Sequence, residues 1–374
     1  MDASFLVHFA DLQDPRIERC KRHALLDILF LAVSAVLAGA EGWEDIEEFG
    51  HTKLDWLRQF VPFANGIPRH DTVARVLSRL NPEALQSCFI EWMQAVAQVT
   101  AGAVVAIDGK TLRRSFDTAS RQSALHMVSA WASGNGVVLG QLRTAAKSNE
   151  ITAIPALLNL LHLRGCIVTI DAMGCQRDIA AAITAQKADY VLAVKANQSA
   201  LHEETVDFFT QARACGFRGV RHAFAEHTDA GHGRVEVRRY WQCGQVEHLS
   251  QRALWSGVKS FALVECERHV NGTVSTEQRY YISSLAVDVE QLARAVRGHW
   301  GIENSLHWVL DMTFREDESR IRRGHAAENI STLRRLALNL LKRETSHAGS
   351  QRKKRRRSGW DDAYREKVLF GHSL

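Results

Sequence analysis

The sequence predicts a protein of the α/β class, with an all-helical N-terminal domain and a β-rich insertion. Residues 1–100 carry apolar side chains at helical spacing. From residue 101 onward, short runs of aliphatic residues alternate with amphipathic stretches, which is typical of a layered α/β structure. Residues 197–285 are polar with alternating apolar positions, which indicates further strands.

The composition is that of an ordinary folded protein. The chain has 374 residues, enough for about two to three domains. Apolar residues make up 46% of it and charged residues 24%, which excludes a mainly disordered or collagen-like chain. Forty-seven Lys and Arg against 42 Asp and Glu give a net charge of +5, which is compatible with a nucleic-acid partner. The seven cysteines include no CxxC pair, so neither a disulfide framework nor a cysteine-based zinc site is expected.

The longest apolar run covers residues 28–40. Its thirteen residues fall short of the 20 or so that a membrane-spanning helix needs, so it predicts a buried helix. The first residues, from Met1 to Ser4, lack the basic segment and apolar core of a cleavable signal. We therefore expect a cytoplasmic protein without a membrane partner.

The N-terminal domain is predicted to consist of successive helices with a loop near Pro62 and Pro68. Asp71 fits the N-cap of one helix, and Asn81-Pro82 ends that helix and starts the next. The predicted helical stretches are 25–40, 43–49, 53–60, 71–80 and 82–99.

After residue 101 the predicted order is three strands, a helix, a strand, a helix and a strand. Residues 133–136, Ser-Gly-Asn-Gly, mark a hairpin between the second and third strands. The strands are predicted at 104–109, 125–131, 137–142, 166–171 and 190–194, and the helices at 150–163 and 176–186.

Beyond the insertion, helical patterns return. Asp288 and Gln291 fit a capping box, and the helix that they start is disturbed at Gly298 and Gly301. Another helix is predicted at 331–342. Residues 351–357, Gln-Arg-Lys-Lys-Arg-Arg-Arg, are predicted to lie in a disordered basic tail.

Two of the predicted strands end in an aspartate. Asp108 and Asp171 each follow a run of buried aliphatic residues. Either one alone is more simply explained as a turn residue, since Asp is common after strands. Two at corresponding strand ends favour a shared cleft, where their charges repel each other unless a cation lies between them.

A third acid, Glu303, lies on a predicted helix beside Trp300 and Ile302. Burying a carboxylate there is costly unless it is paired or binds a metal. His299, His307 and Asp311 stand at positions −4, +4 and +8 from it, on the same helix face. A structural ion pair with Arg297 or Arg315 is an equally good explanation of this glutamate alone.

Asp, Asp and Glu are hard oxygen ligands that suit Mg²⁺ or Mn²⁺. Two such ions can stabilise the attacking and leaving oxygens of a phosphoryl transfer. No nucleophile elbow, P-loop or dinucleotide-binding motif occurs in the sequence, so it gives no support for nucleotide binding.

Seven stretches in order resemble bacterial insertion-sequence transposases of the DDE class, and most closely the H-repeat-associated (ISAs-type) family. The resemblance covers roughly residues 8 to 343. Its stretches are Asp14–Arg16, Gly66–Thr72, Ala106–Lys110, Lys147–Ile151, Thr169–Gln176, His299–Asn304 and Phe314–Asp317.

The resemblance implies a ribonuclease-H-like, retroviral-integrase-type catalytic core at residues 101–345, interrupted by the β-rich insertion at about 197–285. A helical domain at 1–100 would help to bind DNA, and a basic tail would cover 346–374. The implied catalytic and metal-binding residues are Asp108, Asp171 and Glu303, with Mg²⁺ or Mn²⁺, in two copies, as cofactor. The implied partners are double-stranded DNA, namely the terminal inverted repeats of the element and the target, bound by a homodimer or higher oligomer.

The third-acid helix departs from the broader group, in which Tyr, Arg and Lys accompany the glutamate. Val296, His299 and Leu310 stand at those three positions here. The resemblance therefore carries over the metal-binding glutamate, but not the DNA contacts of the missing residues or a hairpin intermediate.

Basic residues near these motifs are predicted to contact DNA. Those on the helix after Pro68 indicate a helix-turn-helix-like module, with a solvated helix face as the equally good alternative. Others follow the strand ends and could contact phosphates beside the metal site. The predicted DNA-binding residues are Arg69, Arg75, Arg79, Lys110, Arg113, Arg114, Lys195, His299 and His307, and the tail at 352–357 would add sequence-independent affinity.

The sequence thus predicts a transposase that cleaves DNA at element ends and transfers the strand into a target. Two alternatives stay open: an inactive or repurposed DNA-binding protein derived from a transposase, and a metal-dependent nuclease that does not join strands. The presence of all three acids argues against a decayed copy.

Overall fold

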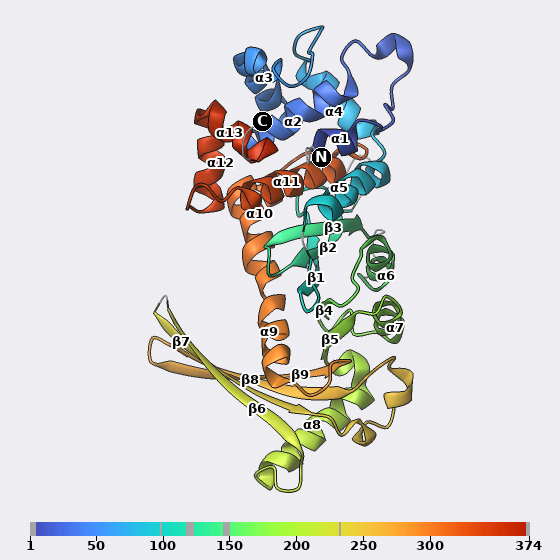
Figure 1. Ribbon diagram of the computed structural model, residues 1–374, viewed down its shortest axis with the longest axis vertical. Helices are drawn as coiled ribbons and strands as arrows, with labels where there is room; N and C mark the ends of the chain where they lie inside the picture. Colours follow the sequence, from blue (N-terminus) through green and yellow to red (C-terminus); the bar gives the residue numbers. More distant parts are fainter. Residues whose placement is uncertain (1–4, 98, 117–122, 145–149, 232, 372–374) are drawn as a thin grey trace.

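The computed structural model describes residues 5–97, 99–116, 123–144, 150–231 and 233–371. The molecule is elongated (Figure 1). Helices from both ends of the chain gather at one end, a sheet with flanking helices forms the middle, and long strand hairpins extend from the other end.

The N-terminal region contains α1 (Phe5–Phe9), α2 (Leu25–Ala38), α3 (Trp43–Leu57), α4 (His70–Arg79) and α5 (Pro82–Val96). Every residue of α2 from Asp27 to Leu37 is buried, which confirms the predicted central helix. Asn81 caps α5, and its side chain accepts a hydrogen bond from the Ala84 amide at 3.0 Å.

The start of α4 differs from the prediction. Asp71 lies inside the first turn and is not the N-cap, which is Arg69. A carboxylate from another helix replaces the missing side-chain cap, because Glu47 of α3 accepts a hydrogen bond from the His70 amide at 2.8 Å.

The middle of the molecule is a mixed sheet whose first five strands have the order β3-β2-β1-β4-β5. Strands β1, β2 and β3 are antiparallel neighbours, whereas β1, β4 and β5 run parallel. The parallel strands are joined through α6 and α7. The bounds are β1 Val104–Thr111, β2 His126–Ala132, β3 Val137–Arg143, α6 Glu150–Leu160, β4 Ile167–Ile170, α7 Arg177–Ala185 and β5 Asp189–Val194.

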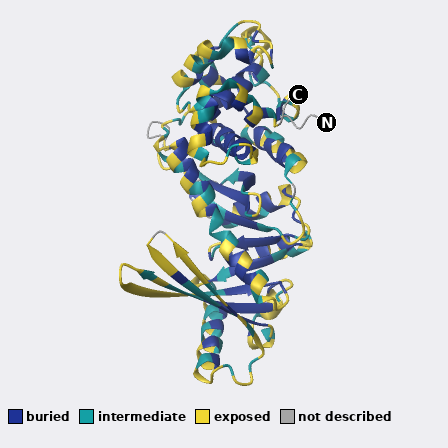
Figure 2. Ribbon diagram, turned by 60° about the vertical axis from the view of Figure 1, so that its left-hand side comes forward, coloured by how far each residue is buried: buried dark blue, intermediate teal, exposed yellow. Residues whose placement is uncertain are grey.

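The insertion continues the same sheet, because β9 pairs antiparallel with β5 and the full order becomes nine strands ending β9-β8-β7-β6. The outer ends of its hairpins are exposed (Figure 2). The insertion begins with a helix, α8, that was not predicted. The bounds are α8 Ser199–Ala214, β6 His222–Gly231, β7 Arg234–Cys243, β8 Ser260–Val270 and β9 Thr273–Ser283.

After the insertion, α9 (Val289–His299) returns along the sheet toward the helical end of the molecule. A π-helical turn at Glu303–His307 joins it to α10 (Trp308–Phe314). Helix α11 (Ala326–Arg343) then packs between the sheet and the N-terminal helices. Its buried Asn339 accepts a hydrogen bond from the Val138 amide and donates one to the Val138 carbonyl, so it occupies backbone groups of the edge strand β3.

The prediction of a disordered basic tail is wrong. Residues Gln351–Trp360 form α12 and Asp362–Phe370 form α13, both packed near α2. Arg355 is buried and donates hydrogen bonds to the carbonyls of Val36, Ala40 and Thr313, at the C-terminal ends of α2 and α10. Helix ends leave such carbonyls unpaired and carry negative partial charge, so an arginine is a favourable partner. The helical end of the molecule therefore uses both termini of the chain.

Among the described residues, no single helix is long and apolar enough to cross a membrane. Helices α2 and α3 reach that length and composition only together, as a pair bent by 97°.

Candidate active site

Asp108 and Asp171 lie at matched positions of two adjacent strands. The parallel register pairs Ile107 of β1 with Ile170, the last residue of β4. The residue that follows each of these two isoleucines is an aspartate. Adjacent strands lie about 4.8 Å apart, and register-matched residues of parallel strands point to the same face. The structure therefore brings together the two acids that the sequence placed at strand ends.

Asp171 also serves the turn that follows its strand. Its Oδ1 atom accepts hydrogen bonds from the amides of Met173 at 3.0 Å and Gly174 at 3.4 Å. This fixes the side chain by one oxygen. The turn role that the sequence offered for Asp171 is therefore present, and it leaves the Oδ2 atom free of these two hydrogen bonds.

Glu303 follows a helix that is fastened to the sheet. Ser133 donates a hydrogen bond to the Gly298 carbonyl at 2.8 Å, and His299 Nδ1 lies 3.1 Å from the hydroxyl of Thr169 on β4. A Cβ at Gly298 would lie 3.1 Å from the side chain of Val104, so the absence of a side chain there lets α9 approach β1 closely. These contacts hold the end of α9 against the start of β1 and against β4, and Glu303 comes close enough to Asp108 for its charge to raise the pKa of that carboxyl.

The expected burial of Glu303 is wrong, because the residue is exposed while Ile302 faces the core. Neither predicted ion-pair partner reaches it, since Arg297 pairs with Asp229 and Arg315 with Glu41 and Glu318. Glu303 opens a π-helical turn. Such turns are rare and occur frequently at functional sites.

Asp108 is the electrostatic centre of the site. Burial raises the pKa of its carboxyl to about 7, and the negative charges of Glu150, Asp171 and Glu303 act in the same direction, against a hydrogen bond from the Gly109 amide. Among the described residues no cationic side chain is ion-paired with Asp171 or Glu303. A group of mutually repelling carboxylates, with this set of hard oxygen donors, fits a divalent cation. Within the same described ranges, however, no three Asp, Glu, His or Cys side chains lie close enough together to form a finished metal cluster.

Two histidines predicted to contact DNA face the sheet instead. His307 Nδ1 lies 3.4 Å from Asp108 Oδ2. Burial lowers the pKa of His307 to about 3, and the positive charges of Arg335 and Lys110 add to this, so the ring is neutral and its contact with Asp108 is not an ion pair. Burial also lowers the pKa of His299, which hydrogen-bonds Thr169. Both positions favour a role in orienting the acids over a DNA contact.

Glu150 and His126 are site residues that the sequence analysis missed. Glu150 Oε1 lies 2.7 Å from His126 Nε2, and the other ring nitrogen lies 2.8 Å from the hydroxyl of Thr111. A Cβ at Gly109 would lie 2.0 Å from the Glu150 carboxylate, so this carboxylate covers the backbone next to Asp108. The only signal in the sequence was that Glu150 starts a predicted helix within one of the seven family-like stretches.

The prediction that Lys110 contacts DNA is not supported by its position. The side chain is 7% exposed, and its Nζ atom lies 2.7 Å from Asp311 and 2.8 Å from Asp317. Asp317 also pairs with Arg113 at 3.1 Å. Lys110 therefore ties β1 to the segment after α10, and its charge is already neutralised.

The other predicted DNA-binding residues are exposed. Arg113 and Arg114 follow β1, and Lys195 follows β5. Arg69, Arg75 and Arg79 project from α4 and its N-cap, while Val73, Val76 and Leu77 bury the opposite face.

Comparison with known proteins decides the family. A family model described as "Transposase DDE domain" matches residues 100–340, and one described as "DDE_Tnp_1-associated" matches residues 6–93. The chain belongs to the DDE transposase family. The first match covers the sheet and α9 to α11, and the second covers α1 to α5.

Relatives of this transposase match over nearly their whole length. "Putative transposase YncI" of Escherichia coli O157:H7 is 46% identical over 370 residues, which are 98% of this chain and 94% of the relative. "H repeat-associated putative transposase YhhI" of Escherichia coli (strain K12) is 42% identical over 372 residues, 98% of both chains. Among solved structures, a piggyBac transposase synaptic complex with hairpin DNA has a TM-score of 0.43 at 12% identity, and the match covers 96% of this chain and 77% of that one.

Proposed function

We propose that this transposase catalyses metal-dependent cleavage of DNA at the ends of its element and then joins the freed 3′-hydroxyl to target DNA. The observation that carries the proposal is the register of β1 and β4, which sets Asp108 beside Asp171, together with the fastening of the Glu303 helix across the same strands. We infer that these three are the catalytic carboxylates.

The strand order β3-β2-β1-β4-β5 supports a ribonuclease-H-like core. In this sheet three antiparallel strands are followed by two parallel ones, and helices lie in the crossovers. In such a core the acids stand at the carboxyl ends of central strands. Ligand sites of open α/β sheets lie at this edge as well.

The donor set favours Mg²⁺ or Mn²⁺, held by Asp108, Asp171 and Glu303. A divalent ion there would supply charge stabilisation to the attacking and leaving oxygens of the phosphodiester. His307 would hold Asp108 in place from one side as a neutral ring, and Glu150, itself oriented by His126, would do so from the side of Gly109. Two bound ions and an oligomer on DNA stay predictions.

DNA binding is assigned to exposed basic residues outside this centre: Arg69, Arg75 and Arg79 on the helical side, and Arg113, Arg114 and Lys195 beside the strand ends. Their guanidinium and ammonium groups suit phosphate oxygens, and none of them needs to enter the acidic centre.

A strand-transfer assay tests the proposal against both alternatives. The protein is incubated with Mg²⁺, a target plasmid and labelled duplexes from the two flanks of its gene, either intact or already cut at the 3′ ends. We expect cleavage of the intact ends and joined products from both substrates. Cleavage without joining from pre-cut ends would indicate a nuclease, and binding without either reaction would indicate an inactive DNA-binding protein.

A further inference from the structure

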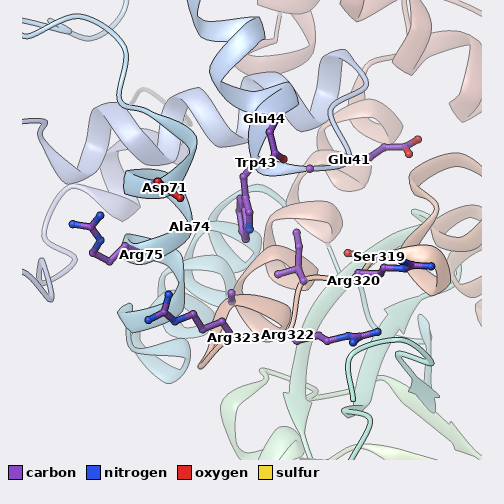
Figure 3. A pocket seen from close by; sticks show the side chains of 13 residues that line it. Glu41, Trp43, Glu44, Asp71, Ala74, Arg75, Ser319, Arg320, Arg322 and Arg323 are labelled. Atoms are coloured by element: carbon purple, nitrogen blue, oxygen red, sulfur yellow. The ribbon is translucent and has the colours of Figure 1, made fainter. Parts of the chain in front are cut away.

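Two clefts flank the exposed face of α4. One has a volume of about 970 Å³ and lies between α4, the start of α3 and residues 319–326 (Figure 3). The other, of about 680 Å³, lies between α4 and the chain before α2. Both are lined by Arg75 and Asp71, so they meet on the exposed face of α4. We call the two clefts together the arginine groove. Its exposed arginines are Arg22, Arg69, Arg75, Arg79, Arg320 and Arg323.

The charges of these arginines are not used within the protein. Across the described ranges, none of the six makes an ion pair. The insertion presents a contrast, because arginines there pair with carboxylates: Arg238 with Asp229 at 2.6 Å, and Arg268 with Glu236 at 3.0 Å. Exposed guanidinium groups without a carboxylate partner are free to bind phosphates and release counterions.

Carboxylates line part of the groove. Glu41 and Glu44 lie beside Trp43 at the start of α3, and Glu41 is paired with Arg315 at 3.2 Å, whereas Asp71 lies on α4 one turn before Arg75. Figure 3 shows Arg75, Arg320, Arg322 and Arg323 around the opposite side. A polyanion would therefore be repelled from the start of α3 and drawn along α4 and residues 320–323.

The segment with Arg320 and Arg323 is fastened to the C-terminal end of α4. The His325 amide donates a hydrogen bond to the Ser78 carbonyl at 3.0 Å, and Asn329 donates to the carbonyls of Leu77 and Leu80. Gly324 has φ +55°, and a Cβ there would lie 2.5 Å from the Ser78 oxygen. These contacts fix the spacing between the two groups of arginines.

The same segment also reaches the catalytic strand. Arg322 donates a hydrogen bond to the Arg114 carbonyl at 2.9 Å, and its guanidinium lies 4.7 Å from the ring of Phe116. Both residues belong to the chain that follows β1, the strand of Asp108. The segment thus contacts both α4 and the chain that leaves the strand of Asp108.

We propose that the arginine groove binds the phosphate backbone of duplex DNA, and that residues 319–323 lead this backbone from the helical end of the molecule toward the catalytic acids. The proposal rests on the proposed function and extends it, because it names the surface and assigns Arg320 and Arg323, which no sequence motif indicated. The contacts are to phosphates, so this binding is independent of base sequence.

The test compares two double variants of the full-length protein. Arg320→Ala/Arg323→Ala removes two charges from the groove, whereas Arg164→Ala/Arg218→Ala removes two exposed charges outside it. Binding of a fluorescent duplex of arbitrary sequence is measured by anisotropy at several KCl concentrations, and thermal melting checks the fold.

For the groove variant we expect about tenfold weaker binding and a salt slope reduced by about 1.8, since each lost phosphate contact accounts for about 0.9. The control should bind like the unmodified protein, and Arg320→Lys/Arg323→Lys should keep most of the slope. A groove variant with unchanged affinity and slope would overturn the proposal.

Two further readouts separate this proposal from others. The unmodified protein could cleave and join DNA while the groove variant binds DNA normally. This result would disprove DNA binding by the arginine groove and would leave the proposed function intact. Poly-glutamate serves as a probe for an acidic protein partner. Poly-glutamate and unlabelled duplex are compared as competitors of the fluorescent duplex at equal charge concentration. If poly-glutamate competed more strongly, the groove would be assigned to an acidic protein partner, and the proposal would be overturned.

Discussion

Asp108 and Asp171 follow the register-paired residues Ile107 and Ile170 on adjacent parallel strands. Their alignment is a property of the backbone pairing and does not depend on any side-chain rotamer. Register-matched residues of parallel strands point to the same face of the sheet. Because both aspartates also stand toward the carboxyl ends of their strands, the two carboxylates lie on the same face at the same edge of the sheet. The predictions below concern what this edge binds and what holds it in place.

Metal binding should depend on pH through Asp108. Its pKa is raised to about 7, so the carboxyl is mostly protonated at pH 6 and ionised at pH 8. Because the raised pKa means that the folded state resists ionisation, stability without metal falls as the pH rises toward 7, and a cation relieves this cost. We expect Mn²⁺ to raise the melting temperature more at pH 8 than at pH 6. The Asp108→Asn protein should lose this difference, and equal shifts at both pH values in unmodified protein would contradict the model.

Arg355 should stabilise the fold and contribute nothing to DNA affinity. Arg355→Ala leaves three carbonyls at helix ends without their donor, which should lower the free energy of unfolding by about 2–4 kcal/mol. The exposed neighbour Arg356→Ala is the matched control and should change stability by less than about 0.5 kcal/mol. Urea unfolding measures both. If Arg355→Ala were as stable as its control but weaker in binding DNA, the basic helix would be a DNA-binding segment after all.

Lys110 should behave as a structural residue. Lys110→Ala would leave Asp311 and Asp317 without their shared cation at 2.7 and 2.8 Å. Because these carboxylates are partly exposed, we expect a loss of about 2 kcal/mol in unfolding free energy, less than for a fully buried pair. The salt slope of DNA binding should stay unchanged. A slope lower by about 0.9 with unaltered stability would instead identify a phosphate contact.

Gly324 should be required for the fastening of residues 319–323 to α4. An alanine there combines a left-handed φ of +55° with a Cβ 2.5 Å from the Ser78 carbonyl oxygen, so the segment must move. We expect a loss of about 1–3 kcal/mol in stability. At Gly134, an added Cβ meets nothing within 4 Å, so Gly134→Ala is the control. The hydrogen-exchange rate of the His325 amide provides a local readout. If this amide exchanged as slowly in Gly324→Ala as in the unmodified protein, Gly324 would not be required for the contact with Ser78.

The sequence predicted the parts of the site that follow from local patterns. An aliphatic run ending in an acid identifies Asp108 and Asp171 without knowledge of the fold, and the mixed α/β class follows from the order of such runs. The family matches over residues 6–93 and 100–340 agree with the resemblance found in seven short stretches. Glu150 was missed because its role depends on His126, a residue on another strand that only the folded sheet brings near.

Charge runs were the main source of error. Residues 352–357 have the composition of a solvated tail, yet Arg355 bonds carbonyls as far away in sequence as Val36. Lys110 likewise resembles a phosphate contact until Asp311 and Asp317 are seen beside it. Whether a basic side chain is free or neutralised depends on long-range partners, which local composition cannot reveal.

The most direct test of the central claim is a cleavage assay on duplexes from the flanks of the gene, with Mg²⁺, for Asp108→Asn, Asp171→Asn and Glu303→Gln. Each substitution keeps the shape of the side chain and removes one charge from the set that would hold the ion. We expect each to lower the cleavage rate by roughly a hundredfold or more, because the developing charge of the transition state loses its support. Melting and duplex affinity should stay close to those of the unmodified protein. Near-normal cleavage by any one of the three proteins would contradict the account and remove that residue from the catalytic site.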